Sequence, residues 1–141
     1  MSRPLLLLVD DDADDVTIAL RAIGRAGLPV EVETCSNGRE ALEALHLSEG
    51  GGEPLRPQVI FLDLRMPQVD GFEVLRRLRD APRTRGIPVV VISSSQQPED
   101  VRRSYELGAN SYLVKRIDPR APGAWLAEAA RYWMLLNQHP E

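Results

Sequence analysis

Two short apolar runs in this chain each stop abruptly at acidic residues. The run over 5–9, LLLLV, is followed by Asp10 and Asp11, and the run over 59–63 ends on Asp63 itself. Short continuous apolar runs are typical of parallel strands that are buried on both faces. In open α/β sheets the ligand-binding groups lie just beyond the carboxyl ends of such strands. The two runs therefore predict an α/β fold in which three carboxylates meet at one edge of the sheet.

Apolar runs alternate with segments of helical periodicity along the rest of the chain, as in a parallel sheet flanked by helices. The expected strands cover residues 5–9, 30–34, 59–63, 88–93 and 111–114. The expected helices begin near Val16, Gly38, Gly71, Pro98 and Ala121, and the second and the last extend to about residues 48 and 138. The polar segment 48–57, rich in glycine and proline, indicates a surface loop.

The composition narrows the classes of function. The 141 residues carry a net charge of −4, which gives no electrostatic reason to expect nucleic acid as a partner. A single cysteine excludes an internal disulfide and fits a reducing compartment. No apolar run approaches the roughly 18 residues that a membrane span needs. We expect a cytoplasmic domain that binds neither nucleic acid nor a membrane.

Two further strand ends also carry polar groups. Ser93 and Ser94 close the fourth apolar run, and Lys115 follows the fifth. Four of the five expected strands therefore deliver a polar group to the same edge, which helix capping alone does not explain. Three like charges within a few ångströms repel one another unless a hard cation lies among them, and Mg²⁺ with oxygen ligands meets that need. The pattern predicts a Mg²⁺-dependent site that accepts a phosphoryl group.

On these residues the chain resembles the receiver domain of two-component response regulators. The acidic pair Asp10–Asp11, the motif LDLRMPQVDG, the hydroxyl residue Ser93 and Lys115 occur in the family's order, and the match covers essentially the whole chain. The resemblance implies a doubly wound sheet of five parallel strands in the flavodoxin-like order 2-1-3-4-5, with an extended C-terminal helix. It also implies a single receiver domain over residues 1–141 with no output domain.

Within that family, three features look most like the small regulators that are paired with bacterial phytochromes. They are the long loop after the second helix, the Tyr-Trp pair in the C-terminal helix and the missing proline after Lys115. The resemblance therefore implies a sensor histidine kinase as partner, with a bacteriophytochrome as the candidate kinase. It also implies that the chain is not an enzyme in the wider sense, because such proteins catalyse only their own phosphotransfer and dephosphorylation.

The resemblance also assigns roles to individual residues. Asp63 matches the carboxylate that accepts the phosphoryl group from the kinase's phosphohistidine. The implied Mg²⁺ ligands are Asp10, Asp11, Asp63 and the backbone carbonyl of Arg65. The implied phosphoryl-binding residues are Lys115, Ser93 and Ser94. Ser93 and Tyr112 match the pair whose movement after phosphorylation reshapes the face formed by the fourth helix, the fifth strand and the fifth helix.

Arg65 and Ser95 lie two positions beyond the acceptor and beyond the hydroxyl residue. In the family that the chain resembles, these positions border the route of the hydrolytic water. A long, flexible arginine is expected to cover the phosphoryl group and obstruct in-line attack, whereas a short serine orients water weakly. The resemblance therefore predicts a comparatively persistent aspartyl phosphate.

Two alternatives remain beside this interpretation. A Mg²⁺-dependent phosphohydrolase of the haloacid dehalogenase type also uses an aspartate at a strand end, and the segment from Asp10 to Ala13 fits its DxDx opening. That family needs a further acidic motif after its lysine, where this chain has the lone Asp118. The second alternative is a pseudo-receiver that binds partners without being phosphorylated, although every catalytic position is filled.

The C-terminal segment predicts a homodimer. Between Ala121 and Leu136 it carries only two charges, and its apolar residues span more than the one face that can dock on the sheet. Surplus aromatic surface is usually covered by a partner, and a two-fold contact is the commonest arrangement. The expected interface residues are Val101, Tyr105, Trp125, Ala129, Tyr132, Trp133 and Leu136. The alternative is that the segment folds back onto its own domain.

Overall fold

The five expected strands form one parallel sheet in the computed structural model, which describes residues 3–140. The first two residues and the last residue of the expected domain lie outside the described part. The strands are β1 (Leu5–Val9), β2 (Glu31–Cys35), β3 (Val59–Asp63), β4 (Val89–Ser93) and β5 (Ser111–Val114). Their order is β2-β1-β3-β4-β5, and every neighbouring pair is parallel. This order confirms the predicted doubly wound topology.

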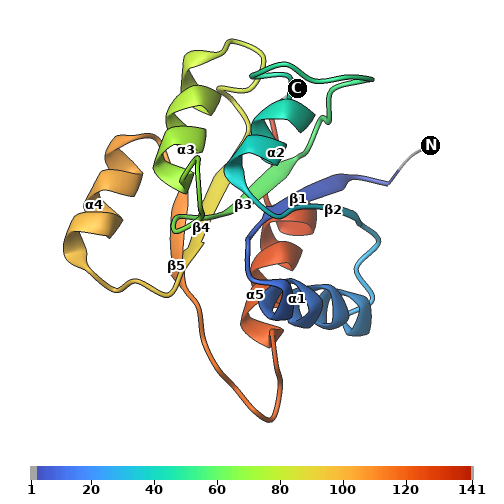
Figure 1. The fold of residues 1–141 in the computed structure, drawn as a ribbon. Coiled ribbons are helices and arrows are strands. Elements are labelled where there is room, and N and C mark those ends of the chain that lie inside the picture. Colours follow the sequence, from blue (N-terminus) through green and yellow to red (C-terminus); the bar gives the residue numbers. More distant parts are fainter. Residues whose placement is uncertain (1–2, 141) are drawn as a thin grey trace.

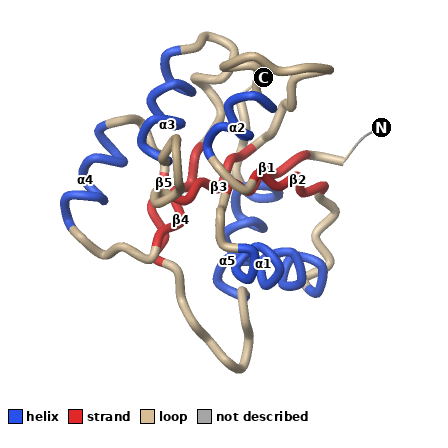
Figure 2. The backbone as a smooth tube through the Cα atoms, viewed as in Figure 1, coloured by secondary structure: helices blue, strands red, loops and turns tan. Residues whose placement is uncertain are grey.

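Within residues 3–140, five α-helices cover the two faces of the sheet (Figure 1). They are α1 (Ala13–Arg25), α2 (Gly38–Ala44), α3 (Gly71–Asp80), α4 (Pro98–Glu106) and α5 (Ala124–Arg131), the last continued by a π-helical turn, η1 (Tyr132–Leu136). Helices α1 and α5 contact each other on one face, and α2 and α3 contact each other on the opposite face. Figure 2 shows the strands as a central layer between these helices.

The central strands are apolar throughout because both of their faces are buried. In β1, Leu7 packs with the layer of α2 and α3, whereas Leu6 and Leu8 pack with α1 and α5. Strand β3 repeats this pattern, and Phe61 is fully buried on the side of α1 and α5. Since alternate side chains enter two apolar layers, neither set needs to be polar. This is why the sequence shows continuous apolar runs.

Short polar side chains start the helices that lie next to the strand ends. Asp12 accepts hydrogen bonds from the backbone N–H groups of Asp14 and Asp15, and Asp70 accepts one from Glu73. These caps satisfy backbone donors that the first turn of a helix leaves free. They turn the chain directly after β1 and again before α3, which keeps the acidic strand ends at the edge of the sheet.

The second and last helices are shorter than predicted. Helix α2 ends at Ala44, because the chain turns at His46, which has a left-handed conformation with a φ of 57°. Helix α5 begins only at Ala124, because Gly123 before it has a φ of 75° and lies against α1. A Cβ at Gly123 would lie 3.0 Å from the backbone oxygen of Ile18, so glycine suits both the conformation and the close approach.

The C-terminal segment docks on its own domain over part of its length. Trp125, Ala129 and Trp133 are partly buried against the core beneath α1 and α5. Tyr132 and Leu136 stay 48% and 68% exposed. Within residues 3–140, no helix is long and apolar enough to cross a membrane, and this includes the apolar C-terminal segment.

Candidate functional site

Three carboxylates meet at the carboxyl edge of the sheet. Strands β1 and β3 are neighbours in parallel register, with Val9 beside Leu62, so the residues at their ends lie side by side. Asp10, Asp11 and Asp63 each offer a carboxylate oxygen, and these atoms all lie within 4.8 Å of one another. Asp10 and Asp63 are buried, whereas Asp11 is exposed. Three hard oxygen donors at this spacing could hold a divalent cation.

Lys115 brings a positive charge to the same cluster. Its Nζ lies 3.0 Å from Asp10 Oδ2 and 3.5 Å from Asp63 Oδ2. Its shortest contact, at 2.8 Å, is with Asp15 Oδ2 in the first turn of α1. The ammonium group therefore compensates part of the acidic charge and lies within reach of a group attached to Asp63.

Asp15 is a site residue that the sequence did not reveal. An aspartate in the first turn of a helix is ordinarily explained by the positive end of the helix dipole. The backbone of Asp15 does belong to the cap made by Asp12, but its side chain turns to Lys115. The only signal in the sequence was that this helix starts beside the acidic strand end, which brings its first turn close to the cluster.

The electrostatics of the cluster centre on Asp63. Burial raises the pKa of Asp63 to about 7, because the carboxylate loses solvation at the end of β3. The charge of Lys115 lowers this pKa, and the charge of Asp10 raises it further. At Lys115, burial lowers the pKa, but the carboxylates of Asp15 and Asp10 outweigh burial and hold the pKa above its ordinary range. In the absence of a cation, the ionised form of Asp63 is therefore costly to the fold.

We expect Asp63→Asn to be more stable than the wild type above pH 7 when metal is removed. The pKa of Asp63 is higher in the folded state than in the unfolded state, so the folded state binds more protons and wild-type stability falls as pH rises from about 4 to about 7. An amide has no charge to desolvate, so the variant should gain roughly 1–4 kcal/mol of unfolding free energy at pH 8. Urea unfolding in EDTA at pH 8 and pH 4 measures the gain, which should shrink at the lower pH. A variant no more stable than the wild type at pH 8 would contradict the expectation.

The hydroxyl residues at the end of β4 lie in different surroundings. Ser93 is fully buried, and its Oγ accepts a hydrogen bond from the Ser95 backbone N–H at 3.1 Å. Ser94 is exposed and lines a cavity of about 400 Å³ beside Lys115. On β5, the Tyr112 hydroxyl donates to the Ser95 carbonyl oxygen at 2.9 Å. Ser93 and Tyr112 are thus joined through the backbone of a single residue, Ser95.

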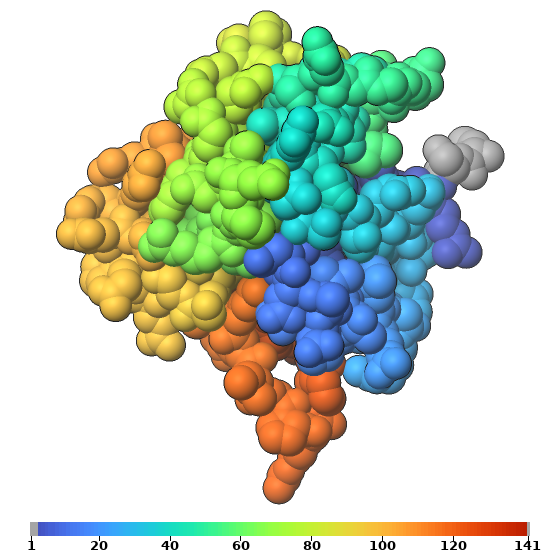
Figure 3. All heavy atoms as spheres, viewed as in Figure 1, coloured from blue at the N-terminus to red at the C-terminus, as the bar shows by residue number. Residues whose placement is uncertain are grey.

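The chain after Lys115 forms an open loop. The Lys115–Arg116 peptide is trans, as is every peptide bond within residues 3–140. The Lys115 backbone N–H donates to the Ser93 carbonyl oxygen at 2.8 Å, so pairing with β4 fixes the position of the lysine. Beyond it the segment protrudes from the molecule (Figure 3), and Ile117 is 97% exposed.

Helix α4 holds the side chain of Arg65. Arg65 Nη2 lies 2.7 Å from Asp100 Oδ2, and the guanidinium carbon lies 5.9 Å from the centre of the Phe72 ring. This placement differs from the expectation that Arg65 covers the acceptor, because the carboxylate of Asp100 pairs with the guanidinium instead. Asp100 is the second site residue that the sequence did not reveal, since nothing local distinguishes it from an ordinary acid in a first helical turn.

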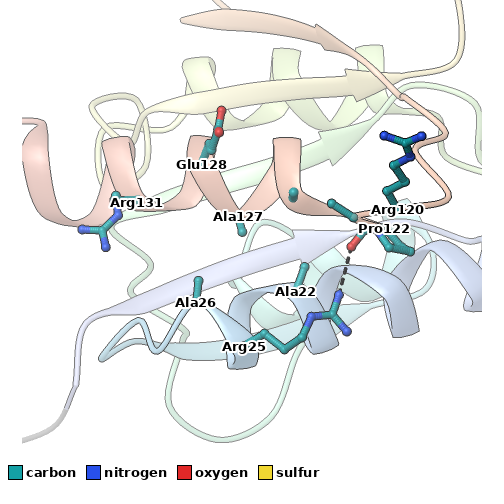
Figure 4. A pocket seen from close by; sticks show the side chains of 10 residues that line it. Ala22, Arg25, Ala26, Arg120, Pro122, Ala127, Glu128 and Arg131 are labelled. Atoms are coloured by element: carbon teal, nitrogen blue, oxygen red, sulfur yellow. Dashed lines mark hydrogen bonds between the residues drawn. The ribbon is translucent and has the colours of Figure 1, made fainter.

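A separate groove lies between α1 and α5 (Figure 4). It has a volume of about 620 Å³, and Ala22 and Ala127 face each other across it. Arg25 spans one end by donating to the Pro122 carbonyl oxygen at 3.1 Å. None of the predicted site residues lines this groove, so it is not part of the carboxylate site.

Comparison with known families and proteins finds relatives over most of the chain. A family model described as the response regulator receiver domain matches residues 6–122, which include Asp10, Asp63 and Lys115. The chain is 39% identical over 136 residues to the probable methanogenesis regulatory protein FilR2 of Methanothrix harundinacea (strain 6Ac). That alignment covers 96% of this chain and 87% of the relative.

Two solved structures share the fold over nearly the full length. The phosphorylated cyanobacterial phytochrome response regulator RcpA has a TM-score of 0.90 at 30% identity, covering 99% of this chain and 100% of that chain. The Mn²⁺-bound form of the response regulator Rcp1, a protein of Synechocystis sp. (strain PCC 6803), has a TM-score of 0.86 at 30% identity, covering 98% and 99%. The likeness confirms the predicted fold and the predicted resemblance to phytochrome-linked regulators.

Proposed function

Because this chain belongs to the response regulator receiver domain family of two-component systems, we propose that Asp63 accepts a phosphoryl group and that the chain acts as a phosphorylation-dependent switch. The observation that carries this proposal is the meeting of buried Asp63 with two further carboxylates and the ammonium group of Lys115. The proposed donor is the phosphohistidine of a sensor histidine kinase. The likeness to the phytochrome regulator RcpA supports a bacteriophytochrome as that kinase.

The side chains at the sheet edge have different roles in the proposed phosphoryl transfer. A P–O bond forms to the Asp63 carboxylate while the P–N bond of the phosphohistidine breaks and the imidazole keeps the electron pair. Lys115, 3.5 Å from Asp63 Oδ2, donates hydrogen bonds to the phosphoryl oxygens and stabilises their charge. Asp10, Asp11 and Asp63, with the backbone carbonyl of Arg65, are the residues that would hold Mg²⁺. When bound, that ion supplies the positive charge that lets an anionic donor approach three carboxylates.

Phosphorylation would act on the rest of the molecule through the end of β4. Ser93 Oγ now accepts a hydrogen bond from the Ser95 backbone N–H, and its own O–H would donate to a phosphoryl oxygen, so movement of Ser93 toward that oxygen would also shift Ser95. The exposed hydroxyl of Ser94, beside Lys115, is free to bind the same group. Movement of Ser95 then pulls on the Tyr112 hydroxyl, which is bonded to its carbonyl oxygen. This chain of contacts supports a change in the face formed by α4, β5 and α5.

The proposed location of the protein is the cytoplasm, and the only reactions that we propose it catalyses are its own phosphotransfer and dephosphorylation. Its net charge of −4 argues against nucleic acid as a partner. The alternative function, a phosphohydrolase of the haloacid dehalogenase type, would need a further acidic motif after Lys115, and this segment does not supply one. Its Asp118 lies in the exposed loop, where the carboxylate accepts a hydrogen bond from the Arg120 backbone N–H.

The C-terminal surface supports a two-fold homodimer as part of the proposal. Three of the seven expected interface residues are partly buried in their own domain: Trp125, Ala129 and Trp133. Three others are exposed: Tyr105 on α4 to 49%, Tyr132 on η1 to 48% and Leu136 on η1 to 68%. Val101 is half-buried. The exposed residues would make the contact, and the tryptophans would support it from beneath.

The proposed function is tested with the intact chain, Mg²⁺ and acetyl phosphate. We expect one phosphoryl group per chain on intact mass, and none when EDTA replaces Mg²⁺, because three carboxylates without a cation repel the anionic donor. The phosphohydrolase would instead consume many equivalents of the donor, and the pseudo-receiver would show no change in mass. Either result would overturn the proposal.

A further inference from the structure

One carboxylate on α4 binds side chains from the two loops that follow β3 and β4. Asp100 Oδ2 accepts hydrogen bonds from Arg65 Nη2 at 2.7 Å and from Ser95 Oγ at 2.6 Å. Arg65 follows β3 by two residues and Ser95 follows β4 by two residues, so Asp100 joins the loops after both strands. Its side chain is only 12% exposed, and charged hydrogen bonds are stronger in such surroundings than at the open surface.

The ordinary role of an acid in a first helical turn does not account for Asp100. Helix α4 begins at Pro98 without a side-chain cap, although Asp100 lies in its first turn. Its carboxylate turns to Arg65 and Ser95, while its backbone carbonyl accepts a hydrogen bond from Ser104 Oγ at 2.7 Å. The side chain therefore links two loops to the helix.

Phosphorylation of Asp63 would create a second anion that attracts Arg65. Arg65 is two residues from the acceptor, so its long side chain can reach either Asp100 or a group on Asp63. A phosphoryl group carries close to two negative charges near neutral pH, against one on Asp100. Which anion holds the guanidinium decides whether the phosphoryl group is covered or open to water.

We propose that Asp100 is a positioning residue that holds Arg65 off the phosphorylated Asp63 and thereby shortens the lifetime of the aspartyl phosphate. This inference rests on the proposed phosphorylation of Asp63. It ties hydrolysis to the position of α4, since Asp100 moves with that helix. A partner that displaces α4 and separates Asp100 from Arg65 would therefore slow the hydrolysis.

A double-mutant cycle on hydrolysis tests the proposal in the full chain. The protein is first phosphorylated with acetyl phosphate and Mg²⁺, and the remaining acetyl phosphate is then removed. The loss of the phosphoryl group is followed by intact mass. Asp100→Asn removes the charge but keeps an oxygen that can accept from Ser95. We expect this variant to lose its phosphoryl group about two- to tenfold more slowly than the wild type, which is the lower part of the range of coupling energies between contacting residues. In an Arg65→Ala background, Asp100→Asn should not change the rate, and Asp100→Glu alone should stay close to wild type.

A second readout follows the Arg65 side chain directly, in the wild type and in Asp100→Asn. The side-chain Nε–Hε resonance of Arg65 in the wild type should stay in place on phosphorylation, because Asp100 keeps the guanidinium. The same resonance should move on phosphorylation of Asp100→Asn. Equal slowing in both backgrounds, faster hydrolysis in Asp100→Asn, or a large movement of the wild-type resonance would overturn the inference alone. Failure of the wild type to take up a phosphoryl group would overturn the proposed function, and the inference with it.

Discussion

Asp63→Asn is expected to take up no phosphoryl group from acetyl phosphate and Mg²⁺ under conditions in which every wild-type chain is labelled. The variant keeps the shape of the side chain but lacks the carboxylate nucleophile that forms the new P–O bond. Within residues 3–140, Asp10 is the one other buried carboxylate in contact with Lys115, and its Oδ1 already accepts a hydrogen bond from the Asp12 backbone N–H. We therefore expect labelling to fall at least about a thousandfold, as on removal of other covalent nucleophiles.

The time course of intact mass measures this loss, and peptide mapping of the wild type should place the label on Asp63. Asp80→Asn is a matched control, because Asp80 is an exposed aspartate on α3 that pairs with Arg76 away from the cluster. It should be labelled at the wild-type rate. Stoichiometric labelling of Asp63→Asn on a different residue would show that the acceptor has been assigned wrongly.

The combined variant Tyr132→Glu/Leu136→Glu is expected to be monomeric at micromolar concentration, where the wild type is expected to be a dimer. Both side chains are exposed on η1, so the substitutions leave the core of the domain intact. In a two-fold contact the four new carboxylates would lie near one another in an apolar interface, where each unpaired charge costs several kcal/mol. A dissociation constant raised at least about a hundredfold follows from even 3 kcal/mol of this cost.

Light scattering coupled to gel filtration measures the mass directly. Leu20→Glu serves as a matched control, since Leu20 on α1 is also a partly exposed leucine, at 40%. That variant should remain a dimer. A monomeric wild type, or a dimer that persists in Tyr132→Glu/Leu136→Glu, would refute the proposed interface. The substitution of Trp133 is a poorer test, because Trp133 contacts the core of its own domain and its loss would disturb the fold.

The sheet could be predicted from the sequence almost residue by residue. The expected strands at 59–63 and 111–114 coincide with β3 and β5, and the expected second strand at 30–34 is displaced by one residue from β2. The two helix ends that were predicted less well depend on contacts beyond the local sequence. The start of α5, for example, is set by Gly123, which has a positive φ and lies against α1. Periodicity within the local sequence does not reveal such a contact.

Local sequence patterns were enough to predict the order of the elements and the edge of the sheet at which Asp10, Asp11 and Asp63 lie. Burial of a strand and periodicity of a helix are local properties, and the parallel connection then brings all carboxyl ends to the same side. The partners of the charged side chains, in contrast, depend on how the helices pack on the sheet. Lys115 meets Asp15 across 100 residues of sequence, and Arg65 meets Asp100 across 35. Such pairings depend on how α1 and α4 pack against the sheet, because a difference of a few ångströms in a helix position decides which of several nearby acids a flexible cation reaches.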